Sequence, residues 1–135
     1  MRKKSFNFSK LVRDKIYQAL IDQGVEVTTV AVTDKASLHE HFKAKLLEEV
    51  EEVTSSTSKK VLLEELGDVL EVIHGFASAL EVDFATIDNI RKTKLHKKGG
   101  FSGGMVIDYV TLPEDHAYVH YYTKQPEKYP EIAPE

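Results

Sequence analysis

The segment Leu46–Val53 reads LLEEVEEV and the segment Leu62–Val69 reads LLEELGDV, and together they decide the fold of this chain. A helix turns by ~100° per residue, so apolar residues three and four positions apart share one face. Both segments show this spacing and belong to longer apolar stripes. The first stripe contains Leu38, Phe42, Leu46 and Val53, and the second contains Leu62, Leu66, Val69, Ile73, Phe76 and Leu80. Two successive amphipathic helices are therefore predicted.

Acidic residues interrupt both apolar stripes. Glu49 projects from the middle of the first stripe, and Glu52 lies one turn further on, at the edge of that stripe. On the second stripe Glu65 lies at the margin and Asp68 one turn beyond it. The polar break Thr54–Ser58 is short, so we expect the two helices to form an antiparallel hairpin. The four acidic side chains can then converge.

Four converging carboxylates require compensation, because burying an unpaired carboxylate costs several kcal/mol and neighbouring like charges raise that cost. Mg²⁺ is a natural solution, since it takes oxygen ligands, keeps several waters and often shares its site with substrate phosphates. The alternative is a solvated charged face. That description fits Glu48 and Glu51 better, because both turn toward water and Lys45, Lys59 and Lys60 are available as partners.

Two further helices and an extended arm are expected outside the hairpin. Apolar residues repeat at helical spacing over Leu11–Leu20 and stop at Gly24, which favours a first helix of about a dozen residues. Val25–Val32 is rich in Val and Thr and is predicted to be an extended arm or short strand. A fourth helix is expected over Asp83–Lys98, ending at Gly99 and Gly100.

The remaining signals complete the predicted fold. Asp34 or Ser37 can cap the second helix, since Ser37 and Glu40 have the spacing of a capping box. Met105–Leu112 and Tyr118–Tyr122 resemble short strands, and the chain from about residue 124 is expected to be an irregular tail. We therefore predict one mainly α domain over residues 1–135. It is an antiparallel bundle of about four helices with a short extended arm and a small β-like C-terminal extension.

Composition limits the functional classes. A net charge of −4 argues against general nucleic-acid binding, which requires a basic surface. The chain has no cysteine, so it has no disulfide framework or thiolate chemistry. No apolar run is long enough for a signal peptide or for a membrane span of ~18 residues, so we expect no membrane association and a reducing cytoplasm.

Two other patterns can be interpreted either as structural features or as parts of a functional site. Arg91, Lys94 and Lys98 form a basic row, which either benefits from the helix dipole or neutralises substrate phosphates. Glu71 and His74 have the Glu-x-x-His spacing of di-iron helical bundles. Those bundles need two such pairs and the chain has one, so we expect His74 to lie at the bundle surface. The other histidines are treated as surface residues.

Three segments, in order, resemble one known family. Glu48–Glu52, followed by Glu65–Asp68, resembles the EExxE…ExxD signature of the all-α nucleoside triphosphate pyrophosphatases, the MazG-like superfamily. Lys10–Ile16 resembles the opening of its phosphoribosyl-ATP pyrophosphohydrolase-like branch. Lys94–Phe101 resembles the basic stretch of that branch, which ends in Gly-Gly-Phe. The likeness covers roughly residues 9 to 105.

The resemblance implies an enzyme that hydrolyses a nucleoside triphosphate between its α- and β-phosphates, with Mg²⁺ or Mn²⁺, and cleans the nucleotide pool. It implies that Glu49, Glu52, Glu65 and Asp68 bind the metal and that Glu48 orients or deprotonates the attacking water. The resemblance also implies that Lys94 and Lys98, with Arg91 in the same row, bind phosphates. Lys10 and Arg13 are expected to reach the substrate or a neighbouring subunit. Family members are usually homodimers or homotetramers.

Two alternatives remain open at this point. The chain could be a phosphoribosyl-ATP pyrophosphohydrolase, to which this branch is similar. It could also be a non-catalytic acidic helical module that binds a nucleotide or a protein partner. Such a module would keep the amphipathic hairpin but would not need Glu49 on an apolar face.

Overall fold

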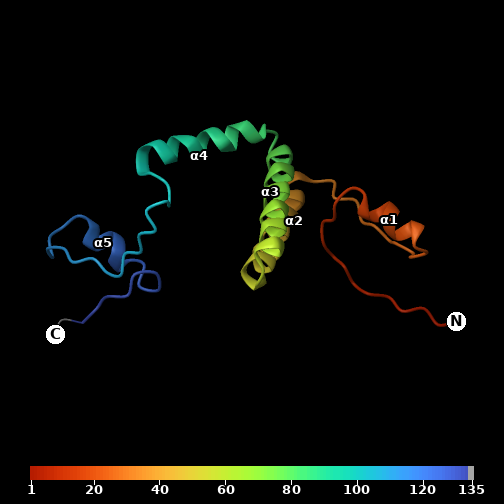
Figure 1. The fold of residues 1–135 in the computed structure, drawn as a ribbon, viewed down its shortest axis with the longest axis horizontal. Helices are drawn as coiled ribbons and strands as arrows, with labels where there is room; N and C mark the ends of the chain where they lie inside the picture. Colours follow the sequence, from red (N-terminus) through yellow and green to blue (C-terminus); the bar gives the residue numbers. More distant parts are fainter. Residues whose placement is uncertain (134–135) are drawn as a thin grey trace. The chain divides into compact units, whose positions relative to one another are not determined.

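The computed structural model describes residues 1–133, and within them the chain is all-α, with five helices and no strand (Figure 1). The helices are α1 (Ile16–Asp22), α2 (Lys35–Ser55), α3 (Lys59–Ala79), α4 (Phe84–Lys98) and α5 (Tyr118–Thr123). The chain forms two compact units: Met1–Lys98 contains α1 to α4, and the residues from Gly99 onward contain α5. The mainly α prediction is thus confirmed.

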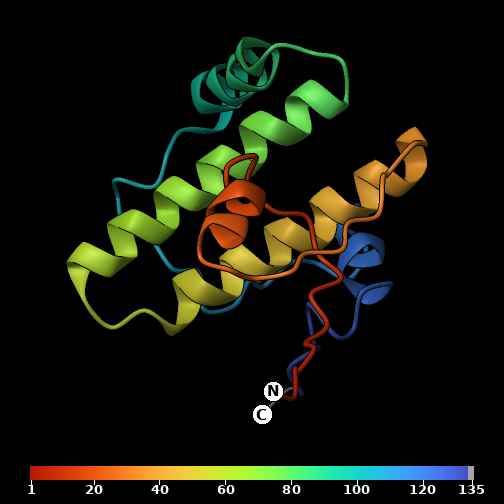
Figure 2. The ribbon, with the colours of Figure 1, turned by 90° about the vertical axis from the view of Figure 1, so that its right-hand side faces the viewer.

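The predicted hairpin is present, with α2 and α3 lying side by side (Figure 2). Both helices begin at a side-chain cap that satisfies an otherwise unpaired backbone N–H. The Asp34 carboxylate accepts the N–H of Ser37 at 2.7 Å, and the Ser58 hydroxyl accepts the N–H of Val61 at 3.2 Å. Asp34 is therefore the cap of α2, and the proposed capping box at Ser37 is not used.

The face of α3 that meets α2 differs from the predicted stripe. Val72 is buried, whereas Leu66 and Leu80 are each 45% exposed. Glu65 lies two turns before Val72, only ~20° away around the helix. The inward face is therefore centred near Val72, and Glu65 lies on this face rather than at its margin.

A close approach of the helices is visible at Gly75. The ring of Phe42 on α2 stacks on that of Phe76 on α3, with centroids 5.4 Å apart and planes 5° from parallel. A Cβ atom built at Gly75 would lie 2.8 Å from Cε1 of Phe42. Glycine at this position therefore gives the Phe42 ring the space to lie against α3.

The first helix is shorter than predicted. α1 has seven residues and ends before Gly24, whose φ of +81° suits a glycine terminator. Leu11 and Val12 precede the helix, in a segment whose Lys10 and Arg13 form ion pairs with the hairpin. These contacts compete with helix formation, because a short isolated helix has little stability of its own. Residues 25–32 form neither helix nor strand, as expected of an extended arm.

The fourth helix agrees closely with its prediction, since α4 ends at Lys98 and is followed by Gly99, with φ of +80°. The predicted strands are wrong. Tyr118–Tyr122 lies in α5, where the rings of Tyr118 and Tyr122 contact each other one turn apart, with centroids 6.4 Å apart. Residues 105–112 have no partner strand within the described part of the chain, and an unpaired strand is not stable in water.

The predicted irregular tail is confirmed in part. After α5, residues 124–133 contain no helix or strand. Residues 134 and 135, which also belong to the predicted tail, lie outside the described residues. None of the helices within residues 1–133 has the length and apolar character needed to cross a membrane.

Candidate metal centre

Four acidic side chains from the hairpin meet in one cluster. α2 supplies Glu49 and Glu52, and α3 supplies Glu65 and Asp68. One carboxylate oxygen from each lies within 4.8 Å of the others. These are the four residues that helical spacing placed beside the apolar stripes, and the antiparallel hairpin brings them together. We refer to them as the acidic cluster.

The cluster contains two buried oxygen atoms without a partner. Glu49 is only 7% exposed, and its Oε2 atom has no hydrogen-bond partner. Oε2 of Glu65 is also buried and unpartnered. A buried carboxylate oxygen without a donor destabilises the fold, because it has lost its hydration and gained nothing in return. The four carboxylates, two of which have a buried oxygen without a partner, could therefore hold a metal ion.

The charge of Glu49 is unfavourable in this environment. Burial raises the pKa of the Glu49 carboxyl, and the negative charge of the neighbouring Glu52 raises it further. Lys45 opposes the shift: its Nζ lies 3.5 Å from Oε1 of Glu49, one helical turn away. Lys45 alone does not balance the charge of the four carboxylates.

Glu48 lies at the border of the cluster and is less exposed than its place on the helix predicts. Its side chain is 30% exposed and its Oε1 accepts a hydrogen bond from Nζ of Lys10 at 3.0 Å. Lys45 lies 3.4 Å from the same oxygen. The hydrogen bond from Lys10 lowers the pKa of Glu48 below its usual range, so Glu48 is ionised at neutral pH.

The segment before α1 supplies a second cation. Nη2 of Arg13 donates to Oδ1 of Asp68 at 2.7 Å. Lys10 and Arg13 therefore hold residues 10–13 against α2 and α3, and Figure 2 shows this segment passing beside the hairpin. Both residues were expected to reach the substrate or a neighbouring subunit, and in the structure they contact the acidic side chains of Glu48 and Asp68.

A cavity of about 230 Å³ opens beside the cluster. It is lined by Phe8, Lys10, Val12, Arg13, Ile16, Lys45, Glu49 and Asp68. Sequence reasoning missed the apolar members of this lining, because it assigned Val12 and Ile16 to a helix face and gave Phe8 no role. It also treated Lys45 as a surface partner, although its i,i+4 spacing from Glu49 could have placed it in the site.

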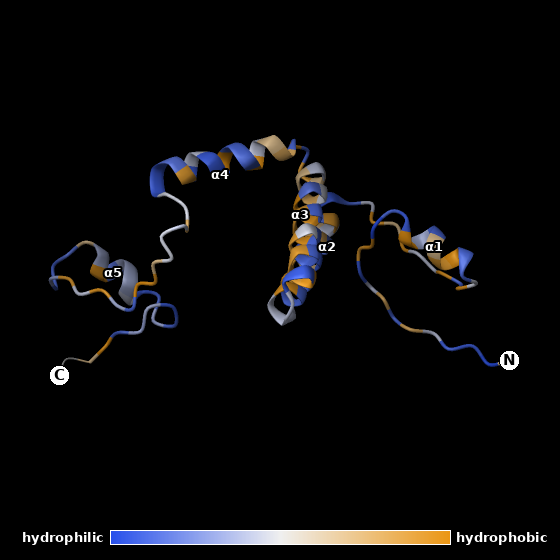
Figure 3. Cartoon of the chain, viewed as in Figure 1, coloured by the Kyte–Doolittle hydropathy of each residue, from blue (hydrophilic) through white to orange (hydrophobic). Residues whose placement is uncertain are grey.

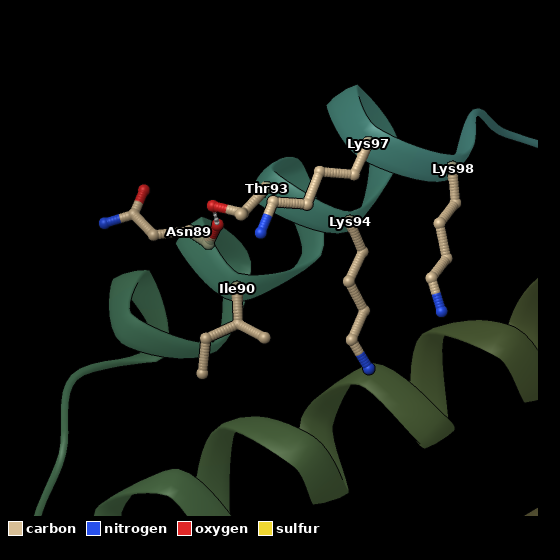
Figure 4. Close-up of a pocket in the computed structure, with 6 residues that line it drawn as sticks. All are labelled: Asn89, Ile90, Thr93, Lys94, Lys97 and Lys98. Atoms are coloured by element: carbon tan, nitrogen blue, oxygen red, sulfur yellow. Dashed lines mark hydrogen bonds between the residues drawn. The ribbon is translucent and has the colours of Figure 1, made fainter.

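The basic row of α4 lines a different depression. Lys94, Lys97 and Lys98 line a cavity of about 450 Å³ along α4 (Figure 4). In this view Lys94 and Lys98 point to the side on which α3 lies. Arg91 is engaged elsewhere, since its Nε donates to Oδ1 of Asp88 at 2.7 Å. Arg91, Lys94 and Lys98 do not line the cavity beside the acidic cluster.

Glu71 and His74 do not belong to the acidic cluster. The ring of His74 stacks on Phe84, with centroids 3.8 Å apart. Within residues 1–133, neither residue belongs to the group of converging acidic side chains. The position of His74 is thus explained by packing of α3 against the start of α4.

The chain matches no protein-family model, and neither curated proteins nor solved structures gave a match. The function of the cluster is therefore inferred from its residues and their arrangement.

Proposed function

We propose that this chain is a nucleoside triphosphate pyrophosphohydrolase. It hydrolyses the bond between the α- and β-phosphates in the presence of Mg²⁺, and it releases a nucleoside monophosphate and pyrophosphate. The main support is the carboxylate of Glu49, which is buried with an unpartnered oxygen among three other carboxylates. The proposal includes a MazG-like arrangement of the helices and a role in cleaning the nucleotide pool.

The ligand set suits a hard divalent cation. Glu49, Glu52, Glu65 and Asp68 offer only carboxylate oxygens, which Mg²⁺ and Mn²⁺ prefer over the nitrogen and sulfur ligands favoured by softer metals. When bound, such an ion neutralises phosphate oxygens and acidifies a coordinated water. Glu52 is exposed and Asp68 is half-buried, so one side of the cluster remains open to a substrate.

The residues around the cluster provide the remaining chemistry. Glu48 is ionised and lies at the border of the cluster, where it accepts a proton from the attacking water or orients that water. Lys10 and Arg13 bind phosphate oxygens and thereby offset the charge on the leaving pyrophosphate. Lys94 and Lys98 add a second phosphate-binding surface on α4.

We also propose that the chain works as a homodimer or homotetramer in the cytoplasm. Leu63, Leu66 and Leu70 recur at helical spacing on α3 and are 60%, 45% and 52% exposed. Apolar side chains in such a row are usually covered by another protein surface. A second copy of the chain would cover them.

Two isosteric substitutions on α2 test the function. Purified protein is incubated with a panel of nucleoside triphosphates, with Mg²⁺ or with EDTA, and the products are separated by ion-exchange chromatography. We expect Glu49→Gln to lower turnover by more than about 100-fold, because it removes a charge that holds the metal. Glu51→Gln is the matched control, since Glu51 is exposed and outside the cluster. Equal turnover in both variants would contradict the proposed site.

A further inference from the structure

Part of the lining of the cavity beside the acidic cluster is apolar, and phosphate binding does not require it. This part consists of Phe8, Val12 and Ile16, and we refer to these three residues as the apolar wall. They are 58%, 39% and 39% exposed, so the fold leaves these side chains accessible at the cavity. All three come from the segment that Lys10 and Arg13 hold against the hairpin.

The rest of the lining is charged with both signs. Lys10, Arg13 and Lys45 carry positive charge, and Glu49 and Asp68 carry negative charge. A ligand that matches the whole cavity is therefore apolar at one end and anionic at the other, and it brings a cation for the carboxylates. A metal-bound nucleotide has these three properties, since its base is flat and its phosphates bind both cations and metal.

The size of the cavity indicates which part of that ligand it holds. Pockets that enclose a whole drug-sized ligand measure ~300–1,000 Å³, and this cavity of about 230 Å³ is smaller. It suits the nucleoside portion, with the phosphates extending along the carboxylates. Phe8 is the aromatic member of the wall, and Nζ of Lys10 lies 5.4 Å from the centre of its ring. Lys10 thus lies next to the aromatic ring of Phe8 as well as in the charged part of the cavity lining.

We propose that the segment Phe8–Ile16 forms the nucleoside-binding wall of the site. Phe8 stacks on the base, and Val12 and Ile16 pack against the base and sugar. Lys10 and Arg13 contact the phosphates from the same segment. This inference rests on the proposed function and extends it, because it assigns selection among nucleotides to the N-terminal segment.

The inference is tested by binding rather than by turnover. Isothermal titration calorimetry with Mg²⁺ compares a non-hydrolysable α,β-methylene nucleoside triphosphate with inorganic tripolyphosphate, which has the phosphates but no base. We expect Phe8→Ala to weaken nucleotide binding by about 10-fold, because base stacking on an aromatic ring is lost. Tripolyphosphate binding should change by less than about 2-fold. Phe6→Ala is the matched control, since Phe6 is 81% exposed and lies outside the cavity lining.

A second variant gives a direct signal of stacking. The chain contains no tryptophan, so Phe8→Trp introduces a single tryptophan, whose emission reports on position 8. We expect nucleotide to quench its emission and tripolyphosphate to leave it unchanged. Two results together would contradict the nucleoside-binding role of the wall and leave the proposed function intact. In that case wild-type protein binds and hydrolyses nucleotides, but Phe8→Ala keeps the same nucleotide affinity and the emission of Phe8→Trp is not quenched. Equal loss of nucleotide and tripolyphosphate binding in Phe8→Ala would also contradict the nucleoside-binding role of the wall. Wild-type protein that binds neither ligand overturns both proposals.

Discussion

Glu49 occupies a helix position that normally carries an apolar side chain in contact with a neighbouring helix. The carboxylate is nearly inaccessible to water, and Lys45 is the nearest opposing charge that the structure gives it. A fold that buries such a charge loses stability in the absence of a ligand and regains it when a cation binds. If the acidic cluster binds a metal as proposed, this residue links metal binding to the stability of the hairpin.

The first prediction at this scale concerns Glu49 and pH. Its pKa is raised in the folded chain, so its ionisation destabilises the fold as pH rises through that value. In EDTA at pH 8, Glu49→Gln should raise the melting temperature by about 3–5 °C, which corresponds to ~1 kcal/mol. At about pH 4 the difference should vanish, because Glu49 is then protonated.

Thermal melts followed by circular dichroism measure this effect, and Glu51→Gln serves as the control with the same chemical change. Adding Mg²⁺ should stabilise the wild type and leave Glu49→Gln nearly unchanged. A melting temperature for Glu49→Gln below that of the wild type in EDTA would show that the charge of Glu49 is well compensated without metal.

The second residue-scale prediction concerns Arg13. Its guanidinium forms an ion pair with the carboxylate of Asp68, so it competes with any cation that approaches this carboxylate. Arg13→Gln should tighten Mn²⁺ binding in the absence of nucleotide by up to about 5-fold, the range expected for a partly exposed ion pair. Nucleotide affinity should fall in the same variant, because a phosphate partner is lost.

Calorimetric titration with Mn²⁺ alone measures the first effect. Arg91→Gln is the matched control, since Arg91 pairs with Asp88 at the same 2.7 Å distance but on α4. Weaker Mn²⁺ binding in Arg13→Gln would mean that Arg13 holds Asp68 in position for the metal instead of competing with it.

The residues of the site differ in how well sequence could identify them. Glu49, Glu52, Glu65 and Asp68 were found because helical spacing fixes which side chains share a face. Phe8 was not found, because its position depends on where the ion pairs of Lys10 and Arg13 hold a non-helical segment, and helical periodicity carries no such information.

At the scale of single elements, α3 has two glycines that should respond oppositely to the same substitution. A Cβ at Gly67 meets nothing within 4 Å, so Gly67→Ala should stabilise the protein by about 0.5–1 kcal/mol through lower backbone freedom. A Cβ at Gly75 meets Phe42 at 2.8 Å. Gly75→Ala should therefore destabilise by roughly 1 kcal/mol, because the cost of overpacking exceeds the gain in helix propensity.

Urea unfolding of the two variants measures this contrast. Each serves as the control for the other, since both place alanine at a glycine position in the interior of α3. Stabilisation by both substitutions would contradict the close contact between Phe42 and α3.

The elements themselves could be predicted where capping and terminator residues mark their ends. Ser58 and Gly99 bound α3 and α4 closely. The segment Tyr118–Tyr122 was wrongly predicted as a strand, because a short run of aromatic and β-branched residues is compatible with either structure. Contacts between tyrosine rings one helical turn apart favour the helix. A search for side chains that alternate every two residues, as in a strand, does not detect such contacts.

At the scale of the whole molecule, many large apolar side chains are exposed. Val72 and Ala77 are the buried apolar residues of the described part, whereas apolar residues are present on all five helices (Figure 3). We expect multi-angle light scattering to give two or four times the chain mass of 15.3 kDa. Leu70→Glu should shift the mass toward the monomer, because it places a charge in the exposed row of α3.

Ser78→Glu is the control, since it adds the same charge at an exposed polar position of the same helix. A monomeric mass for the wild type at micromolar concentration would contradict the proposed assembly. The oligomeric state was expected from sequence only through resemblance, because hydrophobic periodicity does not identify which neighbour covers an apolar face.

The most direct test of the central claim identifies the bond that is broken. Phosphorus NMR follows a nucleoside triphosphate incubated with the wild-type protein and Mg²⁺. The proposed function predicts signals from a nucleoside monophosphate and pyrophosphate, which should not form when EDTA replaces Mg²⁺. Formation of nucleoside diphosphate and orthophosphate, or no turnover of any nucleotide, would contradict the proposed pyrophosphohydrolase.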